Sequence, residues 1–211
     1  VLKYVRALVK VSSTQTLHCA SAPLGVIEGS RADVSFVAGL LLDKMAYHLP
    51  FHRVHQRLLD AGFKVSRPWL TQLGQQASSL LEPIYDAQLA SIRASRVIAM
   101  DETPIKAGQN GPGKMKQGYF WPVYGELDEV CFPFFDNRRA DSVVKTLGLT
   151  PAQSAVLLSD GYSAYENYAR KTGLTHAQCW AHARRELFEA KDAEPTAVAE
   201  GLDHKIGRAH V

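Results

Sequence analysis

Two aspartates in this sequence each follow a short apolar segment, and together they could hold divalent metal ions. Asp101 comes directly after residues 97–100, and Asp160 comes directly after residues 155–159 and before the turn-forming Gly161. Open α/β sheets expose their binding sites at the ends of strands. Carboxylates from neighbouring strands can bridge Mg²⁺ ions, which prefer oxygen ligands and leave positions open for phosphate oxygens. The pair therefore predicts phosphodiester chemistry, in which two ions about 4 Å apart activate the attacking oxygen and stabilise the leaving one.

Other interpretations of these aspartates and their neighbours stay open. Both aspartates could simply end turns, where Asp is common. Glu102 follows the first aspartate directly, but neighbouring residues on a strand point to opposite faces, so Glu102 is not expected to share the metal. Asp136, which ends a later predicted strand, is an alternative ligand or a surface turn residue. His176, Cys179 and His182 form an H-x₂-C-x₂-H pattern that lacks the paired second half of zinc motifs, so zinc is not expected.

Residues 96–204 show the pattern of strands and helices that would position the aspartates. Three β-prone runs come first, although Pro122 and Pro133 are unfavourable inside strands. Apolar strands then alternate with short helices. The predicted strands are 97–100, 119–124, 130–135, 155–159 and 175–180, and the predicted helices are 140–147, 163–171 and 182–191. This βββαβαβα order is typical of an α/β fold with an RNase H-like mixed sheet core, although other α/β folds share it.

The region before this core, residues 31–95, is predicted to be helical. The first helix is expected to start after Asp33 as its N-cap and to end before Pro50. The second helix is expected from Pro50 to Asp60, and the third begins after the capping Ser66 and reaches Leu81. Three helices with short joints resemble a helix-turn-helix unit, with the third as the recognition helix. The alternative is a helical bundle that packs on the catalytic sheet.

Composition limits the classes of protein to which the chain can belong. The 211 residues are 46% apolar, which is enough for a buried core and argues against disorder. No run of about 18 apolar residues occurs, so a membrane role is not expected. Three scattered cysteines fit a reducing compartment better than a disulfide-linked secreted module. Residues 1–100 hold 11 Lys and Arg against 6 Asp and Glu, which suits binding of a polyanion, although an ordinary solvated surface would look the same.

Three motifs in order resemble a known family. They are Asp-Glu-Thr-Pro at 101–104, Asp-Gly-Tyr at 160–162 and Cys-Trp-Ala-His-Ala-Arg-Arg at 179–185. Together they resemble the insertion sequence 66 family of bacterial DDE-type transposases, over roughly residues 30–192. The resemblance implies that Asp101 and Asp160 are the first two catalytic carboxylates and that they bind Mg²⁺ or Mn²⁺.

The family's third carboxylate, a Glu in an Asn-Glu-Arg-Ala-type motif, has no counterpart in this sequence. The available glutamates follow too soon after the Arg pair, and none sits in such a motif: Glu186, Glu189, Glu194 and Glu200. The cysteine cluster that usually precedes this region in the family is also missing. We therefore expect a transposase fragment that is inactive alone, with residues 1–30 as the remnant of an N-terminal region.

Phosphate and DNA contacts are expected at two places. Arg side chains bind phosphate oxygens through a bidentate fork, and basic residues near a helix-turn-helix turn contact the DNA backbone. The residues near the scissile phosphate would be His182, Arg184 and Arg185, and those near the helical turn would be Arg53, Arg57, Lys64 and Arg67. The alternative is that both groups are ordinary exposed residues of helices.

The resemblance implies metal-dependent cleavage and strand transfer at the DNA ends of an insertion sequence. The expected partners are transposon ends and target DNA, with possible homo-oligomers, in the bacterial cytoplasm and associated with the nucleoid. Two rival functions are a non-catalytic DNA-binding protein derived from a transposase and an RNase H-type metal-dependent nuclease. Residues 205–211 are expected to be a non-native tail, because Ile-Gly-Arg-Ala-His-Val is what one frame of a common sequencing adapter encodes.

Overall fold

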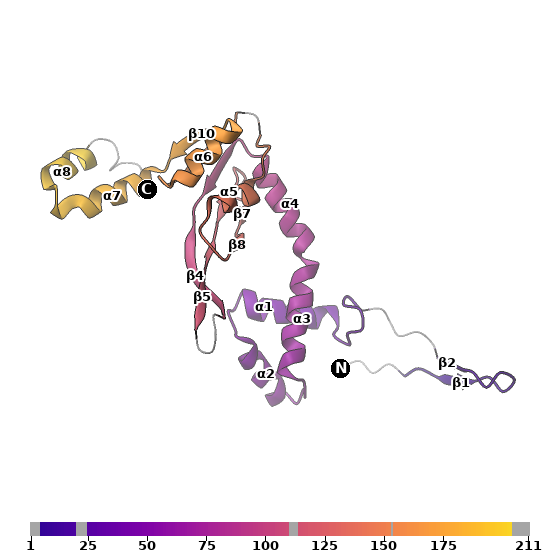
Figure 1. The fold of residues 1–211 in the computed structure, drawn as a ribbon. Coiled ribbons are helices and arrows are strands. Elements are labelled where there is room, and N and C mark those ends of the chain that lie inside the picture. Colours follow the sequence, from indigo (N-terminus) through magenta and orange to yellow (C-terminus); the bar gives the residue numbers. More distant parts are fainter. Residues whose placement is uncertain (1–4, 20–24, 110–113, 153, 204–211) are drawn as a thin grey trace. The chain divides into compact units, whose positions relative to one another are not determined.

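The computed structural model describes residues 5–19, 25–109, 114–152 and 154–203 (Figure 1). The chain divides into two compact units, Val1–Glu82 and Pro83–Val211, each with a hydrophobic core of its own. The tail predicted at residues 205–211 lies outside the described residues.

The first unit consists of a small hairpin followed by three helices. The hairpin pairs β1 (Leu8–Lys10) with β2 (Leu17–Cys19), and the helices are α1 (Val34–Met45), α2 (Phe51–Asp60) and α3 (Arg67–Leu80). Both predicted N-caps are confirmed, because the Asp33 side chain accepts a hydrogen bond from Ser35 N and the Ser66 hydroxyl accepts one from Trp69 N.

Apolar residues at helical spacing hold the three helices of this unit together. Val37 and Leu40 of α1 pack with Val54 of α2 and with the fully buried Leu70 and Leu73 of α3. The named side chains of α1 and of α3 recur three residues apart, and Phe51 and Leu58 flank Val54 at the same kind of spacing in α2, so each helix turns one apolar stripe toward a shared core. The sequence pattern therefore accounts for this unit well.

The second unit is built around a mixed five-stranded sheet in the order β10-β9-β3-β6-β7. The central strand β3 pairs parallel with β9, which pairs parallel with β10, whereas β6 and β7 continue the sheet antiparallel on the other side of β3. Its strands are β3 (Val97–Met100), β6 (Val123–Tyr124), β7 (Val130–Cys131), β9 (Val156–Ser159) and β10 (Thr175–Gln178).

A second sheet, of three antiparallel strands, contains the hairpin that leaves β3. Its strands are β4 (Thr103–Gln109), β5 (Met115–Phe120) and β8 (Phe134–Phe135), in the order β4-β5-β8. The predictions of single strands at 119–124 and 130–135 were wrong, because each of these segments crosses from one sheet to the other. The crossings fall at Pro122 and Pro133, which have no N–H to donate to a ladder. The strand β4 was not predicted.

Three helices cover one face of the five-stranded sheet (Figure 1). They are α4 (Glu82–Arg93), α5 (Ala140–Leu147) and α6 (Ser163–Thr172). Ile92, Val143 and Tyr165 from these helices pack against Ile98 and Leu157 of the central strands. Arg93 also ties α4 to the end of α5, because its guanidinium donates hydrogen bonds to two carbonyl oxygens there.

The helix α4 was missed in the sequence. Pro83 looks like a helix breaker after the apolar end of α3, yet it lies in the first turn of α4. Proline is tolerated in a first turn because the N–H that it lacks would have no partner within the helix.

The described chain ends in α7 (Trp180–Glu189), a 3₁₀ turn (Ala190–Asp192) and α8 (Pro195–Asp203). None of the α7 residues is buried, and Trp180 and Phe188 are largely exposed. Within the described part of the chain, every helix is too short or too polar to cross a membrane. The three cysteines are free thiols.

The core of the second unit predicts a clear stability difference between two leucines. Leu157→Ala removes a fully buried side chain from the central sheet, so we expect a loss of about 2–5 kcal/mol in the free energy of unfolding. Leu149→Ala, at a site that is 58% exposed, should change it by less than about 0.5 kcal/mol. Urea denaturation followed by tryptophan fluorescence measures both. Equal losses would contradict the placement of Leu157.

Candidate active site

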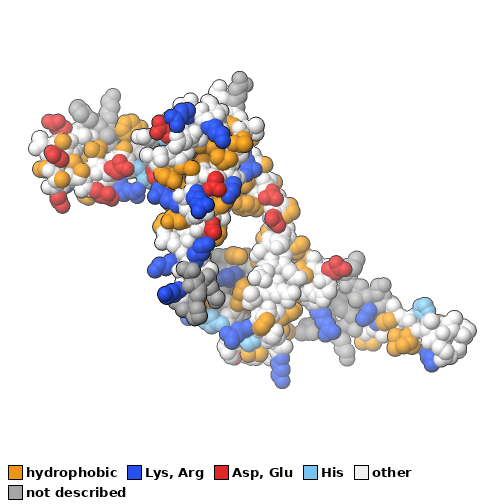
Figure 2. Space-filling view, in the orientation of Figure 1, with side chains coloured by type: hydrophobic (Ala, Val, Ile, Leu, Met, Phe, Trp, Pro, Cys, Tyr) orange, Lys and Arg blue, Asp and Glu red, His pale blue; other side chains and the backbone are white. Residues whose placement is uncertain are grey.

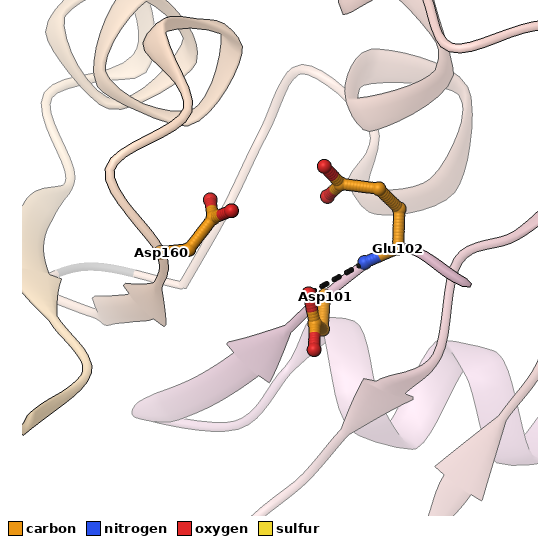
Figure 3. Close-up of side chains that lie close together, drawn as sticks. All are labelled: Asp101, Glu102 and Asp160. Atoms are coloured by element: carbon orange, nitrogen blue, oxygen red, sulfur yellow. Dashed lines mark hydrogen bonds between the residues drawn. The ribbon is translucent and has the colours of Figure 1, made fainter. Parts of the chain in front are cut away.

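The two predicted aspartates lie at the same edge of the five-stranded sheet. Asp101 follows β3 and Asp160 follows β9, and these strands pair parallel with Ala99 opposite Leu158. Because both strands run in the same direction, their carboxyl ends meet and the following residues lie side by side (Figure 3). Asp101 is further held by its backbone N–H, which donates to the Pro122 carbonyl.

A third carboxylate joins the two aspartates. One oxygen of each of Asp101, Glu102 and Asp160 lies within 4.8 Å of the other two. The sequence predicted that Glu102 points away from the aspartates, on the assumption that it continues the strand. However, β3 ends at Met100, so the alternation of a strand does not apply to Glu102. The Glu102 N–H instead donates to the Asp101 carboxylate (Figure 3).

Glu102 is held by two neighbours, Arg138 and Tyr165, that were not predicted as site residues. Its side chain is only 3% exposed, and its carboxylate accepts hydrogen bonds from the Arg138 guanidinium and the Tyr165 hydroxyl. Burial raises the pKa of Tyr165 far above its usual value, and the hydrogen bond to Glu102 and the nearby carboxylates add to this shift. The Tyr165 hydroxyl therefore remains protonated and serves as a donor to Glu102.

Arg138 connects the two loops that carry the aspartates. Its guanidinium binds Glu102 and lies 4.5 Å from the ring centre of Tyr162, while the Tyr162 N–H donates to Asp160 Oδ1 at 2.9 Å. Partial burial lowers the pKa of Arg138, but the hydrogen bond and the attraction to Glu102 outweigh this effect and raise the pKa overall. The arginine therefore keeps its positive charge beside the three carboxylates.

No motif in the sequence marks Arg138, and only the structure brings it to this site. It follows the turn at 136–137, far from the predicted motifs in the chain.

A polar pocket of about 460 Å³ surrounds the carboxylates. It is lined by Asp101, Glu102, Thr103, Pro104, Gln117, Tyr119, Arg138, Asp160, His182 and Arg185. His182 and Arg185, which were predicted to lie near the scissile phosphate, both line this pocket. Arg184 is exposed and does not line the pocket. His182 Nε2 lies 3.7 Å from Asp101 Oδ2, which is too far for a hydrogen bond.

The pocket has the chemistry that a divalent ion and a phosphate require. Its three carboxylates supply the oxygen ligands that Mg²⁺ and Mn²⁺ accept. Arg138, Arg185 and His182 supply nitrogen donors on the other walls, where phosphate oxygens could be bound.

The remaining candidate ligands lie elsewhere. Asp136 forms an ion pair with Lys116, and hydrogen bonds from Lys116 and Asn137 hold its pKa below the usual value. His176 bonds to the Ser159 hydroxyl at 2.8 Å. Among the described residues, the one group of three or more His, Cys, Asp or Glu side chains able to share an ion is the carboxylate cluster.

The basic residues of the helical unit divide into two kinds. Arg53 and Arg67 line a surface hollow of about 490 Å³ together with His52, His55 and Gln56. Arg57 instead forms an ion pair with Asp43, and Lys64 is exposed in the loop before α3. The DNA contacts of these four residues stay a prediction.

Comparison with known proteins decides the family. A family model described as "Transposase IS66 family" matches residues 29–210. This chain belongs to the IS66 transposase family.

Two similar proteins of Sinorhizobium fredii (strain NBRC 101917 / NGR234) match this IS66-family chain over 81% of its length. They are the uncharacterized proteins y4qI, at 31% identity, and y4jD, at 29%. A third from the same strain, uncharacterized protein y4hP, is 26% identical over 93% of the chain. The chain spans only about a third of these relatives, 34%, 35% and 37% of their lengths.

The Glu102–Arg138 contact predicts a coupled pair of substitutions. Arg138→Met would leave the buried Glu102 carboxylate without its cation, so we expect a loss of about 1–3 kcal/mol in the free energy of unfolding. This loss is smaller than that for a fully buried ion pair, because the Arg138 side chain is 45% exposed. Adding Glu102→Gln should recover more than half of the loss. Urea denaturation of the parent, the two single variants and the double variant measures these free energies.

Lys145→Met is the matched control, because it removes a cation from an exposed ion pair with Asp141. Its effect should be much smaller than that of Arg138→Met. Additive effects of Arg138→Met and Glu102→Gln would show that the two side chains are not coupled.

Proposed function

We propose that this chain is the front part of the catalytic core of a DNA transposase that cleaves DNA and transfers strands with Mg²⁺ or Mn²⁺. The observation that carries the proposal is the position of Asp101 and Asp160, whose carboxylates meet at the ends of two parallel strands inside a polar pocket. Family membership supports the same chemistry.

The proposal includes an RNase H-like fold for the core from residue 96 onward. Support comes from the sheet, in which three strands run antiparallel from β3 through β6 to β7 and two further strands, β9 and β10, run parallel to β3 on its other side. The helix α5 comes before β9 and the helix α6 before β10, so the strands and helices of this sheet follow the βββαβαβ order expected of such a core.

In this proposal Asp101 and Asp160 are the metal ligands and catalytic carboxylates. Bound ions would polarise the scissile phosphate and lower the pKa of the attacking hydroxyl. His182 and Arg185, on the pocket wall, would orient phosphate oxygens, and Arg184 would contact DNA further from the metal. Glu102 would act through its contacts, since its carboxylate is already held by Arg138 and Tyr165.

The helices of the first unit are proposed to bind DNA as a helix-turn-helix, with α3 as the recognition helix. Arg53 and Arg67 would contact phosphates from the hollow that they line, and Arg57 and Lys64 would add contacts near the turn. Transposon ends and target DNA are the proposed partners, bound by a homo-oligomer associated with the bacterial nucleoid. The third catalytic carboxylate is proposed to lie in the part of the longer relatives that this chain does not span.

Metal binding by this chain is the first test. Isothermal titration with Mn²⁺ should show weak binding, and Asp101→Asn or Asp160→Asn should weaken it by at least about tenfold, since even residues that only support a ligand cost about 10–100-fold. Asp136→Asn is the matched control and should leave binding unchanged, because Asp136 lies outside the cluster and pairs with Lys116. Equal effects of the three substitutions would refute the metal site.

Strand cleavage by a full-length relative carrying this segment is the second test. Mn²⁺-dependent nicking and strand transfer of a labelled element end should occur, and Asp101→Ala should reduce both to the level of the metal-free control. The 211-residue chain should be inactive alone. Cleavage of RNA/DNA hybrids without strand transfer would instead favour a nuclease, and activity that survives Asp101→Ala would exclude the proposed role.

A further inference from the structure

We infer that the β4–β5 hairpin carries a phosphate-binding track for the DNA strand that leaves the catalytic pocket, with Lys106 as its principal contact. The inference rests on the proposed function, because it takes the pocket to hold a DNA strand. It concerns the part of the hairpin beyond Pro104, where the first family motif ends.

The hairpin is strongly basic and starts at the candidate site. Its strands follow directly from Glu102, and residues 103–120 contain three lysines and neither Asp nor Glu. Figure 2 shows basic side chains over this hairpin. A hairpin that carries three positive charges and leads away from a phosphodiester site is suited to bind the phosphate backbone of the same nucleic acid.

The pairing register separates the two faces of the hairpin. Lys106 lies opposite Gln117, and Pro104 lies opposite Tyr119, so these four side chains share one face. Three of them, Pro104, Gln117 and Tyr119, line the pocket. Lys106 therefore extends the pocket-lining face outward along the hairpin.

The opposite face has other contacts. Lys116 and Gly118 lie on it, as does Phe120, which packs edge-to-face with Phe134. Gly118 is required there, because an added Cβ would come within 2.5 Å of the Phe134 ring. Lys116 forms an ion pair with Asp136 at 2.9 Å. This face is thus occupied by β8 and its neighbours.

Lys106 differs from Lys116 in being available. Its side chain is exposed, and it makes no hydrogen bond or ion pair with any residue that the structure describes. Beside it, the Gln117 amide donates to the Tyr119 hydroxyl at 3.0 Å, which fixes two polar groups between the lysine and the carboxylates. The face therefore offers an ordered polar surface that ends in an unpaired cation.

The spacing fits a nucleic acid strand. Lys106 lies two residues beyond Pro104, which lines the pocket on the same face, and two residues of a strand span about 7 Å. This is roughly the length of two nucleotides along one DNA strand. With the scissile phosphate at Asp101 and Asp160, Lys106 would reach a phosphate a few nucleotides away.

The test compares the two lysines in DNA binding by the 211-residue chain. Fluorescence anisotropy with a labelled duplex of about 30 base pairs, in EDTA and between about 50 and 200 mM NaCl, gives the slope of log K against log salt concentration. Lys106→Ala should reduce the magnitude of this slope by about 0.9 and weaken binding roughly five- to tenfold near 0.1 M salt. Lys106→Arg should bind like the parent.

Lys116→Ala is the matched control, because it removes the same charge from the same hairpin on the other face. It should change slope and affinity by less than half as much as Lys106→Ala. Equal effects of the two substitutions, or no effect of Lys106→Ala, would overturn the inference. A photo-crosslinking benzophenone side chain should label the duplex when placed at Gln117 and not when placed at Lys116; labelling from Lys116 alone would also overturn it.

The outcomes separate this inference from the proposed function. Binding is measured without metal, so it does not depend on catalysis. If Asp101-dependent nicking is found while Lys106→Ala binds like the parent, only the hairpin track fails. If nicking is absent but Lys106→Ala alone weakens binding, the surface stands and the catalytic proposal fails.

Discussion

The repulsion among three carboxylates within 4.8 Å is the constraint on which the candidate site depends. Each pair of like charges at this separation costs on the order of 1–3 kcal/mol, depending on how far water screens it. Arg138 offsets part of this repulsion from within the site, and the Tyr165 hydroxyl adds a neutral donor to Glu102. The site can therefore hold its acidic groups together before any cation binds. The Asp101 side chain, which is 44% exposed, stays accessible to a cation.

The same contacts organise the backbone around the site. Parallel pairing of β3 with β9 brings the two aspartates to one edge, and Arg138 links the loops that follow these strands through Glu102 and the Tyr162 ring. Trp121 and Tyr165 fill the core beneath, where they pack edge-to-face. The rigid sheet thus sets the spacing of the aspartates, and the arginine sets the orientation of the loops.

Local signals made part of this structure predictable from the sequence. Asp33 and Ser66 were recognisable as N-caps, and the apolar runs before Asp101 and Asp160 marked two strands correctly, because these features act within a few residues. Arg138 was not predictable, since its partner Glu102 lies 36 residues away and only the fold brings them together. Glu102 was placed on the wrong side because the alternation of a strand was applied beyond Met100, where both the predicted and the observed strand end.

Asp101 and Asp160 are proposed to form the metal site of this IS66-family chain. The most direct test of this metal site is to soak a crystal of this chain in Mn²⁺ and to collect diffraction data at the manganese absorption edge. We expect an anomalous peak between the two aspartates, about 2.0–2.3 Å from a carboxylate oxygen of each. A well-occupied Mn²⁺ bound elsewhere, with no anomalous density between Asp101 and Asp160, would contradict it.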